Sequence, residues 1–226
     1  MTNLKANQVA TDTATGATAQ GPVEVYSLPG AWGLPSISPF CLKLLTWLRM
    51  ADVPYNLHVL HGPPTRPRTR KAPYVVRADG SVLPDSGFII ETLRRERGIT
   101  FDERLTPGER ATALMIERTL EKSAYFVGVY NRWGPKWKAI GADMFPGMPA
   151  ALFRIVTPFV RRRILKQPKA QGVSRNTPEQ IYAIGCADMN ALAELLGDRP
   201  FFFGEPSTID AIMTAGSMMG QEKKKR

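Results

Sequence analysis

The sequence contains little cysteine or histidine, with only two residues of each among 226. Cys41 and Cys186 fall in separate predicted helices and belong to no metal-ligand pattern, so no structural disulfide is expected and Cys186 is interpreted as a small packing residue. His58 and His61 lie near the end of one predicted strand without a third ligand, and they predict no metal site. The disulfide-rich and zinc-stabilised classes of small protein are therefore excluded.

Long apolar runs are also missing. A spanning helix needs roughly 18 consecutive apolar residues, and Arg154 and Pro158 interrupt the best candidate. Residues 1–21 are polar and have no apolar signal-peptide core, so we interpret them as a disordered tail. With 43% hydrophobic and 22% charged residues, the composition is that of a globular protein with a substantial core. These features favour a cytoplasmic protein.

Basic residues outnumber acidic ones by 30 to 20, which gives a net charge of +10. They gather in three groups, at residues 66–71, 161–166 and 223–226. Such groups attract nucleic acid or an anionic membrane. No helix-turn-helix, zinc-finger or RNA-binding aromatic pattern accompanies them, so nucleic acid is not an expected partner. The last group lies in a basic tail, 221–226, and is typical of a solvated chain end.

The second basic group follows an apolar, proline-punctuated stretch at residues 145–160. Two interpretations of this stretch stay open. It has the composition of a helix that lies on a membrane surface, with apolar side chains in the lipid and arginines at the headgroups. It is also typical of a helix that lines an apolar ligand pocket, because aromatic and methionine side chains often do so. The pocket interpretation is favoured.

Short runs of β-branched and aromatic residues predict four strands in the first half of the chain, at residues 23–28, 55–60, 74–77 and 82–83. Asp79-Gly80 is a two-residue hairpin signal, so the last two strands are expected to be antiparallel neighbours. One helix separates the first two strands. A second helix begins at Asp85-Ser86 and ends before Gly98. The predicted order is β-α-β-β-β-α.

The tetrapeptide Ser38-Pro39-Phe40-Cys41 opens the first of these helices. Ser38 is a good N-cap, and Pro39 suits the first helical position. The free N–H groups and partial positive charge of a helix N-terminus stabilise a thiolate. The tetrapeptide is therefore a candidate site for thiol chemistry. A plain cap at Ser38 and a small buried residue at Cys41 are the alternative interpretation.

Two further motifs follow in order, Lys71-Ala72-Pro73 and Asp85-Ser86. Together with the tetrapeptide, they make the first half similar to the glutathione-binding domain of the glutathione transferase superfamily. The resemblance covers about residues 23–211. It implies a thioredoxin-like fold with glutathione as co-substrate.

The resemblance also implies a role for each motif. Ser38 would contact the glutathione sulfur, and Cys41 stands where a redox pair has its second cysteine. Because the sulfur-contacting position is a serine, a two-cysteine disulfide cycle is not expected, although Cys41 could react alone. The bond before Pro73 would be cis, and the backbone of Ala72 would pair with the cysteinyl part of glutathione. The acidic-serine pair, Asp85 with Ser86, would bind the ammonium and carboxylate of the γ-glutamyl end.

The second half predicts helices. Residues 106–109 and 177–180 are capping boxes with proline at the first helical position. The first box opens a long helical stretch that reaches about Arg132. The second opens a helix that ends at Gly197. Residues 207–210 resemble the capping box near the last core helix of transferase C-terminal domains.

Segments 130–133, 171–175 and 197–210 make the chain most similar to the Fax-like and metaxin-like branch of the superfamily. After Ala211 the sequence departs from this pattern, which predicts a shortened or altered C-terminus.

The expected architecture is an α/β thioredoxin-like domain over residues 22–98 followed by an all-α domain over residues 104–220. The resemblance implies a glutathione S-transferase that joins the glutathione thiolate to a small apolar electrophile, with Ser38 and Cys41 as catalytic candidates. The alternative is a non-catalytic, metaxin-like adaptor that associates with a membrane surface or a protein partner. A homodimer is implied by resemblance alone.

Overall fold

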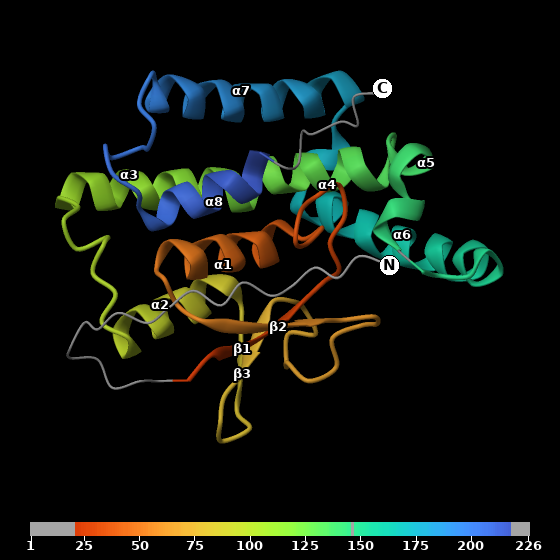
Figure 1. Ribbon diagram of the computed structural model, residues 1–226. Helices are drawn as coiled ribbons and strands as arrows, with labels where there is room; N and C mark the ends of the chain where they lie inside the picture. The colour runs from red at the N-terminus through yellow and green to blue at the C-terminus, as the bar shows by residue number, and fades with distance from the viewer. Residues whose placement is uncertain (1–20, 146, 218–226) are drawn as a thin grey trace, which may run out of the picture.

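The computed structural model describes residues 21–145 and 147–217. The predicted N-terminal tail, apart from Gly21, and the predicted basic tail lie outside the described residues. Figure 1 shows a small sheet with two helices on one face and a layer of further helices beyond them. The expected pairing of a thioredoxin-like domain with a helical domain is confirmed.

The sheet has the strand order β2-β1-β3-β4. β1 (Val23–Ser27) is parallel to β2 (Tyr55–Val59) and antiparallel to β3 (Tyr74–Val76), which is antiparallel to β4 (Val82–Pro84). The hairpin predicted from Asp79-Gly80 is therefore confirmed, and Gly80 takes the positive φ of 81° that such a turn needs.

Helices α1 (Pro39–Met50) and α2 (Ser86–Glu96) cover one face of the sheet. Their apolar faces and the inward residues of β1 and β3 form one buried cluster, to which α8 adds a single side chain. Its members are Val23, Val25, Leu44, Leu45, Trp47, Leu48, Val53, Val75, Ile89, Ile90, Leu93 and Ala211. Burial of this apolar surface, at about 25 cal/mol per Å², is what holds the two helices to the sheet.

The second half is helical throughout its regular elements. They are α3 (Pro107–Arg118), a π-helical turn (Thr119–Ala124), α4 (Tyr125–Trp133), α5 (Trp137–Ile140), α6 (Ala150–Gln171), α7 (Pro178–Leu196) and α8 (Thr208–Ser217), with 3-10 turns at Ala142–Met144 and Val173–Arg175. Both predicted capping boxes form, with each N3 side chain bonded back to the N-cap backbone. The long stretch expected to reach about Arg132 is also confirmed, with the π-helical turn inside it.

Helix α8 joins the two domains. It lies beside α1 and α3 (Figure 1), and the Trp47 indole donates to the Thr208 hydroxyl over 3.0 Å. Before it, Asp210 accepts from both the backbone N–H and the hydroxyl of Ser207, which is one half of the predicted box, while the Asp210 N–H donates to the Ser207 carbonyl and not to its hydroxyl. The chain after Ala211 thus continues this helix to Ser217.

Neither cysteine forms a disulfide: Cys41 is buried and Cys186 is exposed. The packing role predicted for Cys186 is therefore wrong, since α7 turns that side chain to solvent. Among the helices that the structure describes, none is both long enough and apolar enough to cross a membrane.

Candidate functional site

The sheet register brings the three sequence motifs to one edge of the thioredoxin-like domain. Tyr26 near the end of β1 pairs with Tyr74 at the start of β3, and Tyr74 pairs with Pro84 at the end of β4. The loop that leaves β1 toward Ser38, the Ala72-Pro73 bond and the Asp85-Ser86 pair are therefore neighbours, although 47 positions separate the first and last of them.

Ser38 caps α1 as predicted. Its hydroxyl oxygen accepts from the backbone N–H of Cys41 over 3.4 Å, and its own backbone N–H donates to the Ser36 hydroxyl over 3.3 Å. The side chain is half-buried at the positive end of α1. A hydroxyl that accepts a hydrogen bond keeps its own O–H, so Ser38 still has a hydrogen to donate.

Cys41 lies in the first turn of α1, as predicted, with 0% of its surface exposed. A thiol in that position cannot meet a molecule that stays in the solvent. Of the two candidate catalytic residues, only Ser38 is therefore accessible from the solvent.

The bond between Ala72 and Pro73 is cis, as the resemblance implied. Pro73 is buried and Ala72 is half-buried, immediately before β3. In the preceding basic loop, the Arg66 guanidinium lies 5.7 Å from the centre of the Tyr26 ring. Successive side chains of a strand point to opposite faces of the sheet. Because Val25 packs toward α1, Tyr26 and the arginine over its ring lie on the opposite face.

Asp85 and Ser86 open α2. Asp85 has φ 74° and ψ 124°, a strained backbone for a residue other than glycine, and its carboxylate accepts from the N–H of Gly87 over 2.9 Å. Ser86 is buried while Asp85 is exposed. The N-termini of α1 and α2 thus converge on one edge, and both favour negative charge there.

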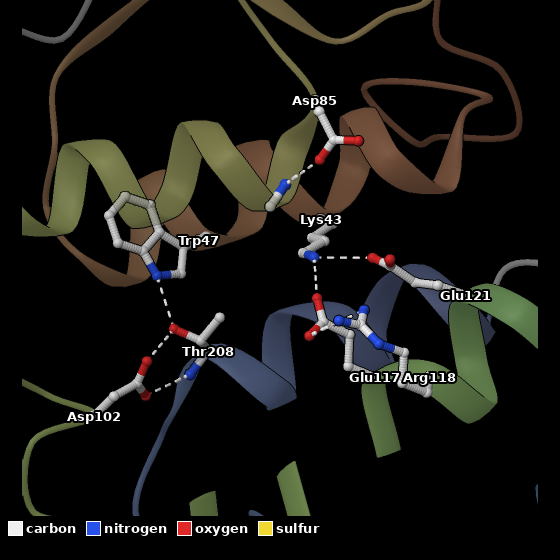
Figure 2. Close-up of polar contacts among 9 residues, drawn as sticks. Lys43, Trp47, Asp85, Asp102, Glu117, Arg118, Glu121 and Thr208 are labelled. Carbon is white, nitrogen blue, oxygen red and sulfur yellow. Dashed lines mark hydrogen bonds and ion pairs between the residues drawn. The ribbon is translucent and has the colours of Figure 1, made fainter. Parts of the chain in front are cut away.

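Lys43, which no sequence motif indicated, lies near the start of α2, with its ammonium close to Gly87. Its side chain is 3% exposed, and its ammonium lies 2.9 Å from Glu117 and 2.8 Å from Glu121. Figure 2 shows the ammonium with dashed lines to both carboxylates. Two sequence features could have indicated this cluster. Glu117 and Glu121 are four residues apart in a predicted helix, which places them on one face, and Lys43 is a single lysine among apolar residues.

Arg132 is a second residue that the sequence analysis did not assign to the site. It is buried, and its guanidinium donates to the carbonyl of Ile37 over 2.9 Å and lies 5.6 Å from the Trp32 ring. Burial lowers the pKa of Arg132. Trp32 in turn donates to Asp143 over 2.9 Å. The helical domain therefore holds the loop that leads into Ser38.

A small cavity of about 30 Å³ begins beside the first turn of α1. Its lining includes Pro39, Phe40 and Tyr125, whose ring meets Phe40 edge-on at 5.0 Å. Burial raises the pKa of Tyr125, so its hydroxyl stays protonated at neutral pH. A larger hollow of about 380 Å³ is lined by α2, α3 and α8 and by charges of both signs, but by none of the three motifs.

Comparison with known proteins identifies the family. The glutathione S-transferase N-terminal domain family matches residues 39–138, and the glutathione S-transferase C-terminal domain family matches residues 185–215. The isoprene-epoxide–glutathione S-transferase of Rhodococcus sp. is 31% identical over 84% of this chain and 82% of its own length. The chain belongs to the glutathione S-transferase superfamily.

Other relatives belong to the branch that the motifs indicated. Failed axon connections of Drosophila melanogaster is 30% identical over 80% of this chain, and metaxin-1 of Mus musculus is 26% identical over 85%. The matches span 46% and 63% of those two proteins. The predicted Fax-like and metaxin-like resemblance is confirmed.

The fold is shared with solved transferases. A glutathione S-transferase from Methylobacterium radiotolerans, crystallised with glutathione sulfonate, superimposes with a TM-score of 0.54 over 87% of this chain and 78% of its own, at 16% identity.

Proposed function

We propose that this protein is a cytoplasmic glutathione S-transferase that binds glutathione at one end of the sheet, where β1 ends, β3 begins and β4 ends. The observation that carries the proposal is the convergence there of Ser38 at the start of α1, the cis bond before Pro73, and Asp85-Ser86 at the start of α2. The relatives that bind or use glutathione by name support it.

The γ-glutamyl end and the cysteinyl part of glutathione each have a partner of suitable chemistry in this proposal. The Ser86 hydroxyl and the free N–H groups of α2 bind the γ-glutamyl carboxylate, and Asp85 binds the ammonium. The Ala72 backbone pairs with the cysteinyl part. Ser38 then donates to the sulfur, so that the bound thiol loses its proton to solvent more readily.

The thiolate attacks an electrophilic carbon. With an epoxide, the chemistry in the name of the Rhodococcus relative, a carbon–sulfur bond forms, the ring carbon–oxygen bond breaks and the released oxygen takes a proton from water. The cavity beside Phe40 and Tyr125 is apolar but holds little more than one water. In the proposed mechanism these two rings separate to admit the electrophile.

Calorimetry with glutathione tests the binding step. Ser86→Ala should weaken binding about ten-fold or more, because a buried hydroxyl bonded to a charged group contributes about 1.5–3 kcal/mol. Ser81→Ala is the matched control, since Ser81 is exposed in the β3–β4 turn. Absence of binding by the folded wild-type protein would contradict the proposal and favour the non-catalytic adaptor, which the Fax and metaxin relatives support.

Turnover of a small epoxide tests the chemical step. Ser38→Ala should lower kcat by about 100-fold, the effect typical of losing one preorganised donor, while glutathione binding persists. The same substitution removes a helix cap, so Thr106→Ala, which uncaps α3, controls for lost stability. Equal turnover in Ser38→Ala and wild type would refute the role of Ser38.

A further inference from the structure

Helix α6 has two different sides. One side packs against α4 and the aromatic cluster around Trp133 and Trp137, and it includes Phe153, Thr157 and Val160. The opposite side carries Leu152, Ile155 and Phe159, which are 47%, 65% and 74% exposed. Spacings of three and four residues place these three side chains on one stripe. Adjacent exposed side chains of this size are typical of a contact surface.

The same stripe becomes basic one turn further along. Arg162, Arg163 and Lys166 are exposed and continue the row that begins at Leu152. The whole helix contains six basic residues and no acidic one. Arg161 alone of the arginine run turns inward, where it donates to the Trp133 carbonyl over 2.6 Å. Apolar and cationic halves therefore follow one another along a single solvent-facing stripe.

Other exposed apolar residues lie in a different setting. Phe88 on α2 and Met115 on α3 are 70% and 68% exposed, but both helices contain acidic as well as basic residues. The pairing of apolar with purely cationic surface thus distinguishes α6 from them.

We propose that the α6 face, formed by Leu152, Ile155, Phe159, Arg162, Arg163 and Lys166, docks on the surface of an anionic bilayer. The apolar residues enter the boundary between headgroups and acyl chains, and the cations meet lipid phosphates. A second copy of the chain fits this face poorly, because two such helices would bring like charges together. Nucleic acid would satisfy the cations and leave the apolar half in water.

This docking would extend the proposed function without depending on it. Apolar electrophiles partition into bilayers, so a transferase held at the lipid surface meets a raised concentration of its substrate. The α6 face contains none of the three glutathione-site motifs, and its loss should leave glutathione binding unchanged.

Vesicle flotation of the full-length protein tests the proposal, with phosphatidylcholine vesicles compared with vesicles that also contain phosphatidylserine. We expect binding only to the anionic vesicles, weakening at high salt. Arg162→Gln with Arg163→Gln should reduce partitioning about 25-fold, at about five-fold per arginine. Ile155→Ser with Phe159→Ser should reduce it at least about ten-fold. The matched controls, Arg95→Gln and Met115→Ser, replace an exposed arginine and an exposed apolar residue elsewhere and should bind like wild type.

Four results would overturn the proposal. One is failure of the folded wild-type protein to float with anionic vesicles at low salt. Another is full binding by the Ile155 and Phe159 variant, which would reduce the effect to non-specific charge attraction. The third is an equal loss in the controls. Tighter binding to an oligonucleotide than to anionic vesicles would assign the basic half to nucleic acid instead. Thermal unfolding of each variant, followed by circular dichroism, separates these results from loss of fold.

Discussion

Helices α1 and α6 have similar compositions and opposite environments. Each combines large apolar residues with arginine or lysine, and neither contains an acidic residue. Seven of the 12 residues of α1 are buried, against two of the 22 residues of α6. Lys43 of α1 has two carboxylate partners in the interior, whereas the cations of the α6 face are exposed. Composition therefore does not decide whether such a helix becomes core or surface.

The difference follows from what surrounds each helix. Helix α1 lies between the sheet and α8 and also packs against α2, so most of its surface meets another element (Figure 1). Helix α6 packs through one side only. The fold thus fixes α1, which positions Ser38, and leaves α6 free to contact another surface.

Removal of a large buried side chain of α1 should have the largest effect on the free energy of unfolding. Trp47 is fully buried and bonded to Thr208, so Trp47→Ala should lower the free energy of unfolding by about 3–5 kcal/mol. Phe159→Ala on α6 should change it by less than about 0.5 kcal/mol. Urea unfolding measures both. Similar losses in the two variants would show that α6 is packed as tightly as α1.

Replacement of the buried lysine of α1 should have the next largest effect on the free energy of unfolding. Lys43→Met leaves Glu117 and Glu121 close together without their ammonium, and breaking such a buried pair costs about 3 kcal/mol. The matched triple variant, which adds Glu117→Gln and Glu121→Gln, should recover most of that loss. Replacement of Arg163 on α6 by Met should be nearly neutral. If the triple variant is as unstable as Lys43→Met, packing rather than charge explains the effect.

Helix ends offer a smaller test. Helix α3 begins with a complete capping box, whereas no side chain caps α6, whose N-cap is Pro149. Thr106→Ala should cost about 1 kcal/mol in the free energy of unfolding. Val156→Ala, within α6, provides a comparison that leaves both helix ends intact. An unchanged urea midpoint for Thr106→Ala would mean that the cap does not limit stability.

The smallest effect concerns pH. Hydrogen bonds from the Thr106 backbone and side chain lower the pKa of Glu109 below the ordinary glutamate value of about 4.5. A lowered folded-state pKa gives stability that is present above the unfolded pKa and is lost as pH falls through the folded one. Glu109→Gln keeps a neutral box, as Gln180 does in α7. The advantage of wild type over this variant should therefore shrink below about pH 4.5 in urea midpoints. A constant difference would contradict the assignment.

The local features of this protein were predictable from sequence because their causes are local. A proline at the first helical position, a glutamate three residues after a threonine, or Asp-Gly between two strands determines nearby backbone, and α1, α3, α7 and the β3–β4 hairpin begin and turn where those residues indicated. The order of the motifs was also enough to indicate the family.

What the sequence could not determine depends on contacts between distant segments. Lys43 and Glu117 are 74 positions apart in the sequence, and Ile37 and Arg132 are 95 apart. These residues meet only when the helical domain packs against the thioredoxin-like domain. The burial of Cys41 and the exposure of Cys186 follow from the same packing. Apolar periodicity in the sequence shows that a helix has an apolar face. Only the tertiary structure decides whether another element covers that face, because burial depends on residues that are distant in the sequence.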